Sequence, residues 1–380
     1  MAQQNGHKVK IVTYDCGVGA DCDMDILEVR AKEYSYHGIP VFAFQYKDEP
    51  FGLHYIVDRN QGVNFAKYIL EKEKPDLIHV GHLMRVFPII FAAMEMGIPY
   101  VMTLTDFHLL CPKIMLMPTS DSLCSGPEGG EACAKLCGEL PTAFIKQRLE
   151  LTKDVLAHAA RVIAPSKFVA DLFQHEIPEL KILVNNHGLR QNNLIRKEKV
   201  YDEDNLTFGF IGNLAVHKGP QHLIRVFSEM NHPTARLLIY GTGETEFVNN
   251  LRNMAKDRKI EFRGAFPANT LPEVMREIDV FVNPALWYET YSFVNQEALA
   301  SEVPVVCSKL GGMYERIVEG KNGFTYSAGD SEELKKILMN LINSPAQLNQ
   351  MREYIRFKTL IPVIEQEAYR YNHVYNMAVK

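Results

Sequence analysis

The chain has 380 residues, of which 47% are hydrophobic, enough for two globular domains of ordinary size. A net charge of -5 and a pI near 6.2 argue against a nucleic-acid-binding protein, which would carry a basic face. The start, MAQQNGH, lacks the apolar core of a secretion signal, and no apolar run reaches the length of a membrane span. We therefore expect a cytoplasmic protein whose seven cysteines are mostly reduced.

The first half of the chain alternates predicted strands and helices. A strand over 9–14 leads into Gly17-Val-Gly19, a loop that we expect to approach a ligand, and then into a helix over 23–37. The spacing of apolar residues predicts further strands and helices over 40–46, 65–72, 76–80, 86–96, 100–104, 142–160, 161–164, 167–176 and 182–184. Ser166 is the expected cap of the helix that starts at Lys167. Thr105, Asp106 and His108 follow a strand directly, where ligands bind in open α/β sheets.

Four of the seven cysteines lie in one glycine-rich segment, 111–138: Cys111, Cys124, Cys133 and Cys137. Four thiolates suffice for a closed structural zinc site, with an iron-sulfur cluster as the rarer variant. Their spacings fit no common C-x2-C pair, so buried unbridged thiols, or a disulfide formed after isolation, remain the alternatives.

The predicted helix 142–160 carries Lys146, Arg148 and Lys153 among apolar residues. These cations suggest a peripheral contact with an anionic membrane at its inner face. Glu150 and Asp154 interrupt them, which favours an ordinary surface helix.

A polar segment over 188–205 has no apolar periodicity and is the expected interdomain linker. We expect a first domain over 1–190, a second over 191–360 and a final helix in 361–380 that returns to the first. Lys218 precedes a helix opened by Gly219-Pro220, a suitable place for a cation that neutralises a diphosphate. Asp330 and Glu333 form an expected capping pair.

The segment 280–323 reads as strand, loop, helix and strand. A helix that begins near Ser292 would direct free N–H groups and its positive dipole end at a phosphate. Glu297 lies in its first turns, where a carboxylate can bind ribose hydroxyls, and Glu289 lies on the loop before it, near the expected sugar. Gly311-Gly312 is expected to let the backbone approach a ligand closely.

This segment resembles the E-x7-E signature of family 4 retaining glycosyltransferases, with matches at Glu289, Glu297, Ala298, Ala300, Pro304, Val305, Gly311, Gly312 and Glu315. Segments 75–82, 97–106, 164–166 and 206–219 are similar to other parts of that family. This chain has Thr290, Ser292 and Glu302 where the signature has Pro, Gly and Gly. It has Thr105 in place of His and Asn213 in place of Arg, for which Arg190 or Arg263 could substitute.

The resemblance implies the GT-B fold, in which two Rossmann-like α/β domains face a cleft. It implies retaining transfer, independent of metal, of a sugar from a nucleoside diphosphate sugar to a hydroxyl of a glycan, a lipid-linked glycan or a small molecule. The implied catalytic residues are Glu289, Lys218, Asp106 and His108. The implied donor-binding residues are Gly19, Thr105, Asn213, Gly241, Thr242, Tyr291, Ser292, Phe293 and Glu297. Alternatives are a nucleotide-sugar-binding protein that has lost catalysis and another GT-B enzyme, such as a nucleotide-sugar epimerase.

Overall fold

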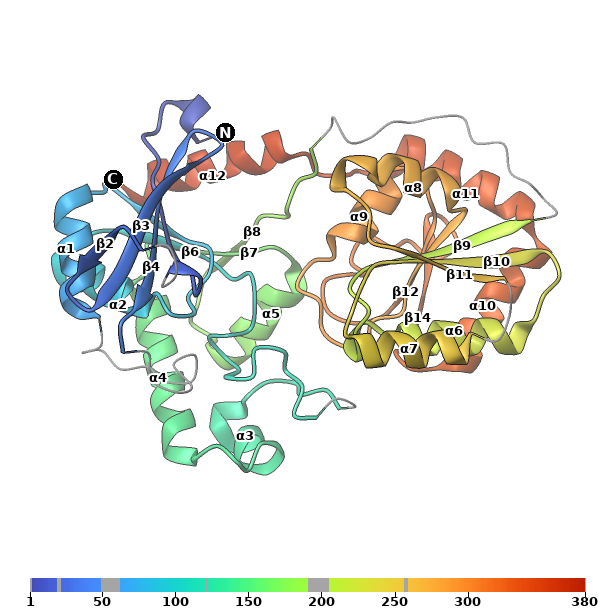
Figure 1. Ribbon diagram of the computed structural model, residues 1–380, viewed down its shortest axis with the longest axis horizontal. Helices are drawn as coiled ribbons and strands as arrows, with labels where there is room; N and C mark the ends of the chain where they lie inside the picture. The colour runs from blue at the N-terminus through green and yellow to red at the C-terminus, as the bar shows by residue number, and fades with distance from the viewer. Residues whose placement is uncertain are drawn as a thin grey trace.

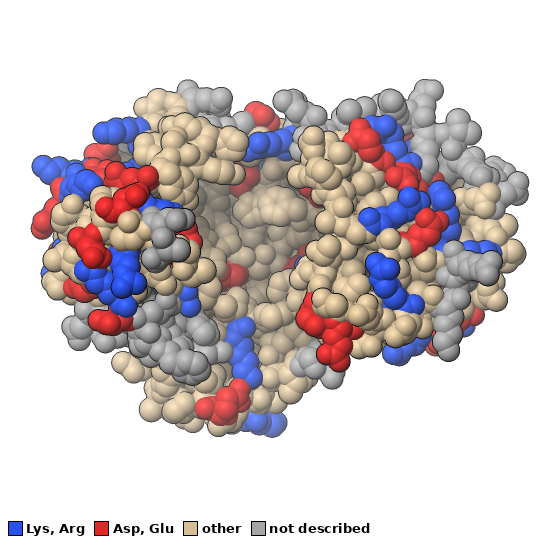
Figure 2. Space-filling view, viewed as in Figure 1, with Lys and Arg blue, Asp and Glu red and all other residues tan. Residues whose placement is uncertain are grey.

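Two α/β lobes lie side by side with a hollow between them (Figures 1 and 2). The computed structural model describes residues 2–18, 22–48, 62–119, 122–190, 205–255 and 259–379. Gly19 and most of the expected linker lie outside the described residues. Nowhere in these ranges is a helix both long enough and apolar enough to cross a membrane.

The first lobe contains two four-stranded sheets. In one, the strand order is β1 (Ile11–Tyr14), β4 (Ile39–Tyr46), β3 (Val29–Tyr36) and β2 (Met24–Ile26). The other is wholly parallel, in the order β5 (Ile78–Val80), β6 (Tyr100–Thr103), β7 (Arg161–Ala164) and β8 (Ile182–Val184). Its helices are α1 (Val63–Glu73), α2 (Phe87–Met96), α3 (Glu131–Leu136), α4 (Thr142–His158) and α5 (Lys167–Glu176).

The helix predicted over 23–37 is wrong, because this segment forms the hairpin of β2 and β3. Val29 and Ala31 are fully buried while Arg30 between them is exposed, which is the two-residue period of a strand. β3 pairs antiparallel with β4 along its whole length. This pairing with the next strand, together with the hydrophobic face that it covers, outweighs the local preference of the charged residues for a helix.

The second lobe is built on a six-stranded parallel sheet. The strand order is β11 (Ile260–Gly264), β10 (Ala235–Tyr240), β9 (Leu206–Ile211), β12 (Val280–Asn283), β13 (Val305–Ser308) and β14 (Gly323–Tyr326). Its helices are α6 (Pro220–Met230), α7 (Thr245–Met254), α8 (Leu271–Glu277), α9 (Phe293–Ala300), α10 (Ser331–Asn343) and α11 (Pro345–Lys358).

The last helix, α12 (Ile364–Ala378), crosses from the second lobe to the first, where both chain ends lie (Figure 1). The Tyr371 hydroxyl lies 2.9 Å from Oγ1 of Thr103 in β6. Nδ1 of His79 in β5 lies 2.6 Å from the Tyr375 hydroxyl. These contacts attach the end of the chain to the parallel sheet of the first lobe.

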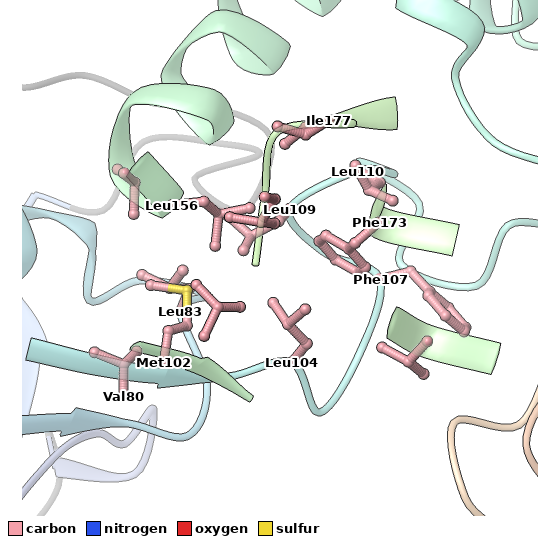
Figure 3. Close-up of a cluster of buried hydrophobic side chains, with 14 of the residues drawn as sticks. Val80, Leu83, Met102, Leu104, Phe107, Leu109, Leu110, Leu156, Phe173 and Ile177 are labelled. Atoms are coloured by element: carbon pink, nitrogen blue, oxygen red, sulfur yellow. The ribbon is translucent and has the colours of Figure 1, made fainter. Parts of the chain in front are cut away.

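The loop after β6 is anchored in the core of the first lobe. Figure 3 shows Phe107, Leu109 and Leu110 from this loop among buried side chains of β5, β6, α4 and α5. Thr152 of α4 donates a hydrogen bond of 2.7 Å to the Leu109 carbonyl. The loop is therefore held firmly beside the hollow.

Arg148 of α4 turns inward and donates a hydrogen bond to the His108 carbonyl. Its side chain is buried, so it is not part of a basic surface. Lys153 pairs with Glu150 at 3.1 Å. The basic membrane-facing stripe that the sequence suggested is thus not formed, because Arg148 and Thr152, four residues apart, share the face of α4 that packs on the loop.

Candidate functional site

The hollow between the lobes contains a cavity of about 670 Å³, which we call the cleft (Figure 2). It lies beyond the carboxyl ends of β6, β9 and β12, where parallel sheets present their ligand sites. The predicted site residues that line it are Thr105, Asp106, Asn213, Lys218, Glu289, Ser292, Phe293 and Glu297. Residues from both lobes therefore meet around one space.

Lys218 and Glu289 form the centre of the cleft. The Lys218 ammonium lies 2.5 Å from Oε1 of Glu289, whose side chain is almost fully buried. The same ammonium lies 4.7 Å from the ring centroid of Trp287, and Nε1 of Trp287 is 3.4 Å from Oε1 of Glu289. Both charges are thus fixed in place, with an aromatic surface beside them.

Two backbone contacts bring the loops of Lys218 and Glu289 together. The Leu286 N–H donates to the His217 carbonyl at 2.8 Å. Gly219 has a φ of 73°, and a Cβ at this position would lie 1.9 Å from the Pro284 carbonyl oxygen. Only glycine fits this approach without displacing the chain, so it determines where Lys218 lies.

Two positions that are glycine in the signature that segment 280–323 resembles keep a glycine-like backbone here. Ser292, before α9, has a φ of 66°, and Glu302, after it, has a φ of 62°. Oγ of Ser292 lies 3.2 Å from Nδ2 of Asn283, which also donates to Asn295 at 2.9 Å. Glu302 is buried and accepts two hydrogen bonds from Arg356, at 3.0 and 2.7 Å. Side-chain partners therefore hold a backbone conformation that non-glycine residues rarely adopt.

Glu297 extends from α9 into the cleft. Within the described ranges, no hydrogen-bond donor or cation pairs with its carboxylate. Burial raises the pKa of Glu297 above its usual value. A desolvated carboxylate that faces an open space is suited to accept hydrogen bonds from ligand hydroxyls.

Asp106 lies on the first-lobe wall of the cleft. One of its oxygens is 3.0 Å from Nε2 of His82, and the other accepts the His108 N–H at 2.7 Å. Burial opposes ionisation, but these partners hold the pKa of Asp106 below its usual value. Oγ1 of Thr105, its neighbour, donates to the Gly81 carbonyl at 2.5 Å. The carboxylate is therefore charged and fixed.

Four expected site residues do not line the cleft. The His108 ring is buried beneath the loop, 6.0 Å from the ring of Phe87. Tyr291 is buried and its hydroxyl donates to the His187 carbonyl at 2.6 Å, a contact toward the first lobe. Gly241 and Thr242 instead adjoin the loop after β9, where a Cβ at Gly241 would lie 1.8 Å from the Gly212 carbonyl oxygen.

Gly311 and Gly312 approach protein backbone and not the cleft. A Cβ at Gly311 would lie 2.3 Å from the Glu289 carbonyl oxygen. The Gly312 N–H donates to that same carbonyl at 2.7 Å. The glycine pair thus supports the loop that carries Glu289, which corrects the expectation of direct ligand contact.

Lys218 is the only Lys or Arg among the described residues that line the cleft, and the carboxylates of Asp106, Glu289 and Glu297 line the same space. Arg263, one suggested substitute for the missing arginine, pairs with Glu261 at 2.8 Å outside the cleft. Arg190 is exposed and does not line it either. A negatively charged ligand would therefore depend on this single cation and on backbone N–H groups.

Sequence reasoning gave no site role to three residues that matter here. His82 pairs with Asp106, Trp287 contacts both central charges, and Asn283 orients Ser292. His82 and Asn283 lie at or just beyond the carboxyl ends of strands, where ligands bind in parallel sheets, and this position could have marked them as site residues. Their partners lie on other segments and could not be read from spacing.

The four clustered cysteines line a second, much smaller cavity below the loop after β6. All seven cysteines of the chain are described, and each is a free thiol. Burial raises the pKa of Cys133 to about 12. Within the described ranges, no three His, Cys, Asp or Glu side chains are arranged as a metal-binding group.

Comparisons with known proteins agree over both lobes. Residues 191–358 match the family of glycosyl transferases group 1, and residues 2–186 match the glycosyl transferase 4-like domain. An uncharacterized glycosyltransferase of Methanocaldococcus jannaschii is 24% identical over 325 residues, which cover 84% of this chain and 76% of that protein. The alpha-maltose-1-phosphate synthase of Mycolicibacterium smegmatis is 30% identical over 155 residues, only 38% of this chain and 40% of the synthase.

The fold is shared with solved glycosyltransferase structures. Anabaena Alr3699/HepE in complex with UDP and glucose matches with a TM-score of 0.65 and 18% identity, over 89% of this chain and 86% of that one. The predicted architecture, two Rossmann-like domains facing a cleft, is confirmed.

Proposed function

We propose that the chain is a glycosyltransferase of group 1, the family whose model matches residues 191–358, and that it transfers a hexosyl unit, with retention of anomeric configuration, from a nucleoside diphosphate sugar to a hydroxyl acceptor. The acceptor is a glycan, a lipid-linked glycan or a small molecule. The observation that carries the proposal is the Lys218–Glu289 pair, which lies in a cleft between two lobes with the desolvated carboxylate of Glu297 on the same cleft.

In this proposal the second lobe binds the donor. The diphosphate lies between Lys218 and the first N–H groups of α9, where a cation and a helix dipole both favour negative charge. Glu297 accepts hydrogen bonds from the ribose hydroxyls, as acidic residues do in other nucleotide sites. Glu289 binds hydroxyls of the donor sugar near the anomeric carbon.

The first lobe presents the acceptor to the donor. Asp106 on this wall, held by His82, orients the attacking hydroxyl. As the bond to the diphosphate breaks, negative charge grows on the leaving oxygen, and Lys218 with the α9 N–H groups stabilises it. That phosphate oxygen then takes the acceptor proton, so the scheme needs neither a divalent metal nor a carboxylate base. His108, buried beneath the loop, has no role at the reacting atoms.

A thermal-shift panel of UDP, GDP, ADP, CMP and their sugar conjugates tests donor binding, because a ligand that binds only the native state raises Tm. UDP and UDP-glucose are tried first, since HepE has been solved with UDP-glucose and with UDP and glucose. We expect a clear shift with one diphosphate and its sugar. A chain that binds none of them would contradict the proposed donor site.

Transfer itself is tested by the release of nucleoside diphosphate, measured with and without acceptor candidates. Release that requires an acceptor supports a transferase, whereas interconversion of the nucleotide sugar without acceptor would indicate an epimerase. Binding without any turnover would indicate a protein that has lost catalysis. The anomeric configuration of the product, read by NMR, distinguishes retention from inversion.

A further inference from the structure

Four cysteines from separate parts of the segment 111–138 converge on one small cavity. Cys111 lies in the loop after β6, and Cys124 lies in an irregular segment further along the chain. Cys133 and Cys137 lie one turn apart at the end of α3. Cys124, Cys133 and Cys137 are less than a tenth exposed. The cavity, of about 10 Å³, is otherwise lined largely by apolar residues such as Leu110, Leu116 and Leu140. All four cysteines therefore line the same small cavity, although up to 26 positions separate them in the sequence.

The segment that carries these cysteines has little regular structure of its own. Among its described residues, the only α-helix is the six-residue α3 (Figure 1). Ile114, Leu116 and Glu128 have φ values of 69°, 53° and 50°, which non-glycine residues rarely adopt. The ordering of such a segment costs conformational entropy that a single short helix does not offset. A cross-link at its centre would add to the stabilisation that Leu116, Cys124 and Ala132 give it by packing in the core of the first lobe.

We propose that Cys111, Cys124, Cys133 and Cys137 bind one structural zinc ion as four thiolates. Four sulfur ligands satisfy the closed tetrahedral geometry that zinc adopts in structural sites, with no position left for a substrate. On binding, the four thiols release four protons, and the resulting site carries a charge of -2. In the arrangement observed here the sulfur atoms do not surround one point, so binding also requires rotation of thiols between staggered χ1 rotamers.

The zinc site would stiffen the first-lobe wall of the cleft. Cys111 lies five residues after Asp106, and Ile114 beyond it lines the cleft itself. Tyr288, from the loop of Glu289 in the second lobe, packs against the same core cluster as Cys111 and Cys124. The ion would therefore hold the loop that separates the cysteine cavity from the cleft. The proposed zinc site requires only the four cysteines, so it is independent of the proposed transferase function and of the donor.

The test is metal analysis of the full chain, purified without chelators or metal-affinity resins. We expect about one zinc per chain, as in other structural sites with four cysteine ligands. Cys124→Ser and Cys137→Ser should each lose most of the zinc, while Cys16→Ser, at an exposed cysteine far along the chain from the cluster, should keep it. Because a serine variant can fail to fold, wild-type protein is also stripped with a chelator and titrated with Co²⁺. The visible bands of a tetrahedral cobalt-thiolate complex are then expected, together with a rise in Tm.

Three results would overturn the proposal. One is wild-type protein with substoichiometric zinc that gives no cobalt-thiolate bands. Another is stoichiometric iron in place of zinc. The third is a disulfide between any two of the four cysteines in freshly isolated protein, detected by peptide mass spectrometry under non-reducing conditions.

Discussion

The carboxylate of Glu315 accepts a hydrogen bond of 2.6 Å from the backbone N–H of Phe168. Its other oxygen accepts the Lys167 N–H at 3.1 Å. Glu315 belongs to the second lobe and these N–H groups open α5 of the first, so one lobe caps a helix of the other. The rings of Phe168 and Tyr288 stack beside this contact at 5.1 Å. Glu315, the last residue of the match to the glycosyltransferase signature, thus joins the two lobes and does not line the cleft.

Glu315→Ala should lower Tm, because it removes two hydrogen bonds and a favourable charge at a helix N-terminus. The loss of a cap costs about 0.5–2 kcal/mol, and each kcal/mol corresponds to roughly 2–4 °C for a domain of this size. Differential scanning calorimetry measures the change. Glu332→Ala, at an exposed glutamate of α10, is the control. Equal effects of the two variants would contradict the role of Glu315 as an interlobe cap.

Lys218→Ala and Glu289→Gln should each reduce kcat/KM by at least about tenfold, since each removes a charged contact worth roughly 1.5–3 kcal/mol. Lys218→Ala is expected to act chiefly on kcat if the cation stabilises the leaving diphosphate. The control is Lys336→Ala, at an exposed lysine of α10. Full turnover in both cleft variants would show that the reacting centre lies elsewhere.

Glu297→Ala should weaken nucleotide binding by about tenfold or more, because hydrogen bonds to a charged group contribute roughly 1.5–3 kcal/mol. Titration calorimetry with the diphosphate found in the thermal-shift panel gives Kd directly. Glu332→Ala again serves as the matched control. Wild-type affinity in Glu297→Ala would refute the ribose contact, whatever its effect on turnover.

Gly219→Ala and Gly320→Ala separate backbone strain from steric collision. Gly219 has a φ of 73° and Gly320 a φ of 67°, but only at Gly219 would a Cβ collide with the chain. In both variants the free energy of unfolding should fall by about 1–2 kcal/mol, because alanine is strained in a left-handed backbone conformation. Only Gly219→Ala should also lose activity, because the added methyl separates Lys218 from the loop of Glu289. Comparable activity in the two variants would contradict this argument.

The pair of His82 and Asp106 should make stability depend on pH. The hydrogen bond to Asp106 raises the pKa of His82 above 6.5. Protonated His82 therefore contributes its full stabilisation of the folded state below pH 6.5, and this stabilisation is lost as pH rises through the raised pKa. The pKa of Asp106 is below 3.8, so its contribution is present above pH 3.8 and is lost as pH falls through the lowered value. The Tm difference between wild type and His82→Gln should therefore be largest between about pH 4 and 6.5 and shrink toward pH 9. A difference independent of pH would exclude the charged pair.

Local features of this protein were predictable from its sequence. Ser166 accepts the Val169 N–H and caps α5, and Asp330 accepts the Glu333 N–H and caps α10, both as expected. Lys218, Glu289 and Glu297 could be selected because each lies beside a strand end or a helix start. Apolar periodicity, caps and strand ends depend on neighbours a few residues away, and this is why the alternation of strands and helices was read correctly over most of the chain.

The tertiary structure alone decided which residues meet. Lys218 and Glu289 are 71 positions apart, and Phe168 and Glu315 are 147 apart. β4, which pairs with the hairpin of β2 and β3, is itself held in the sheet by β1, with Ile11 opposite Val41, and His108 is buried because the loop around it packs into the core. Pairing and burial of this kind depend on segments distant in sequence, whose contacts arise only when the chain is folded. The sequence therefore determined the elements and the chemistry available at their ends, while the folded arrangement selected the residues that share the cleft.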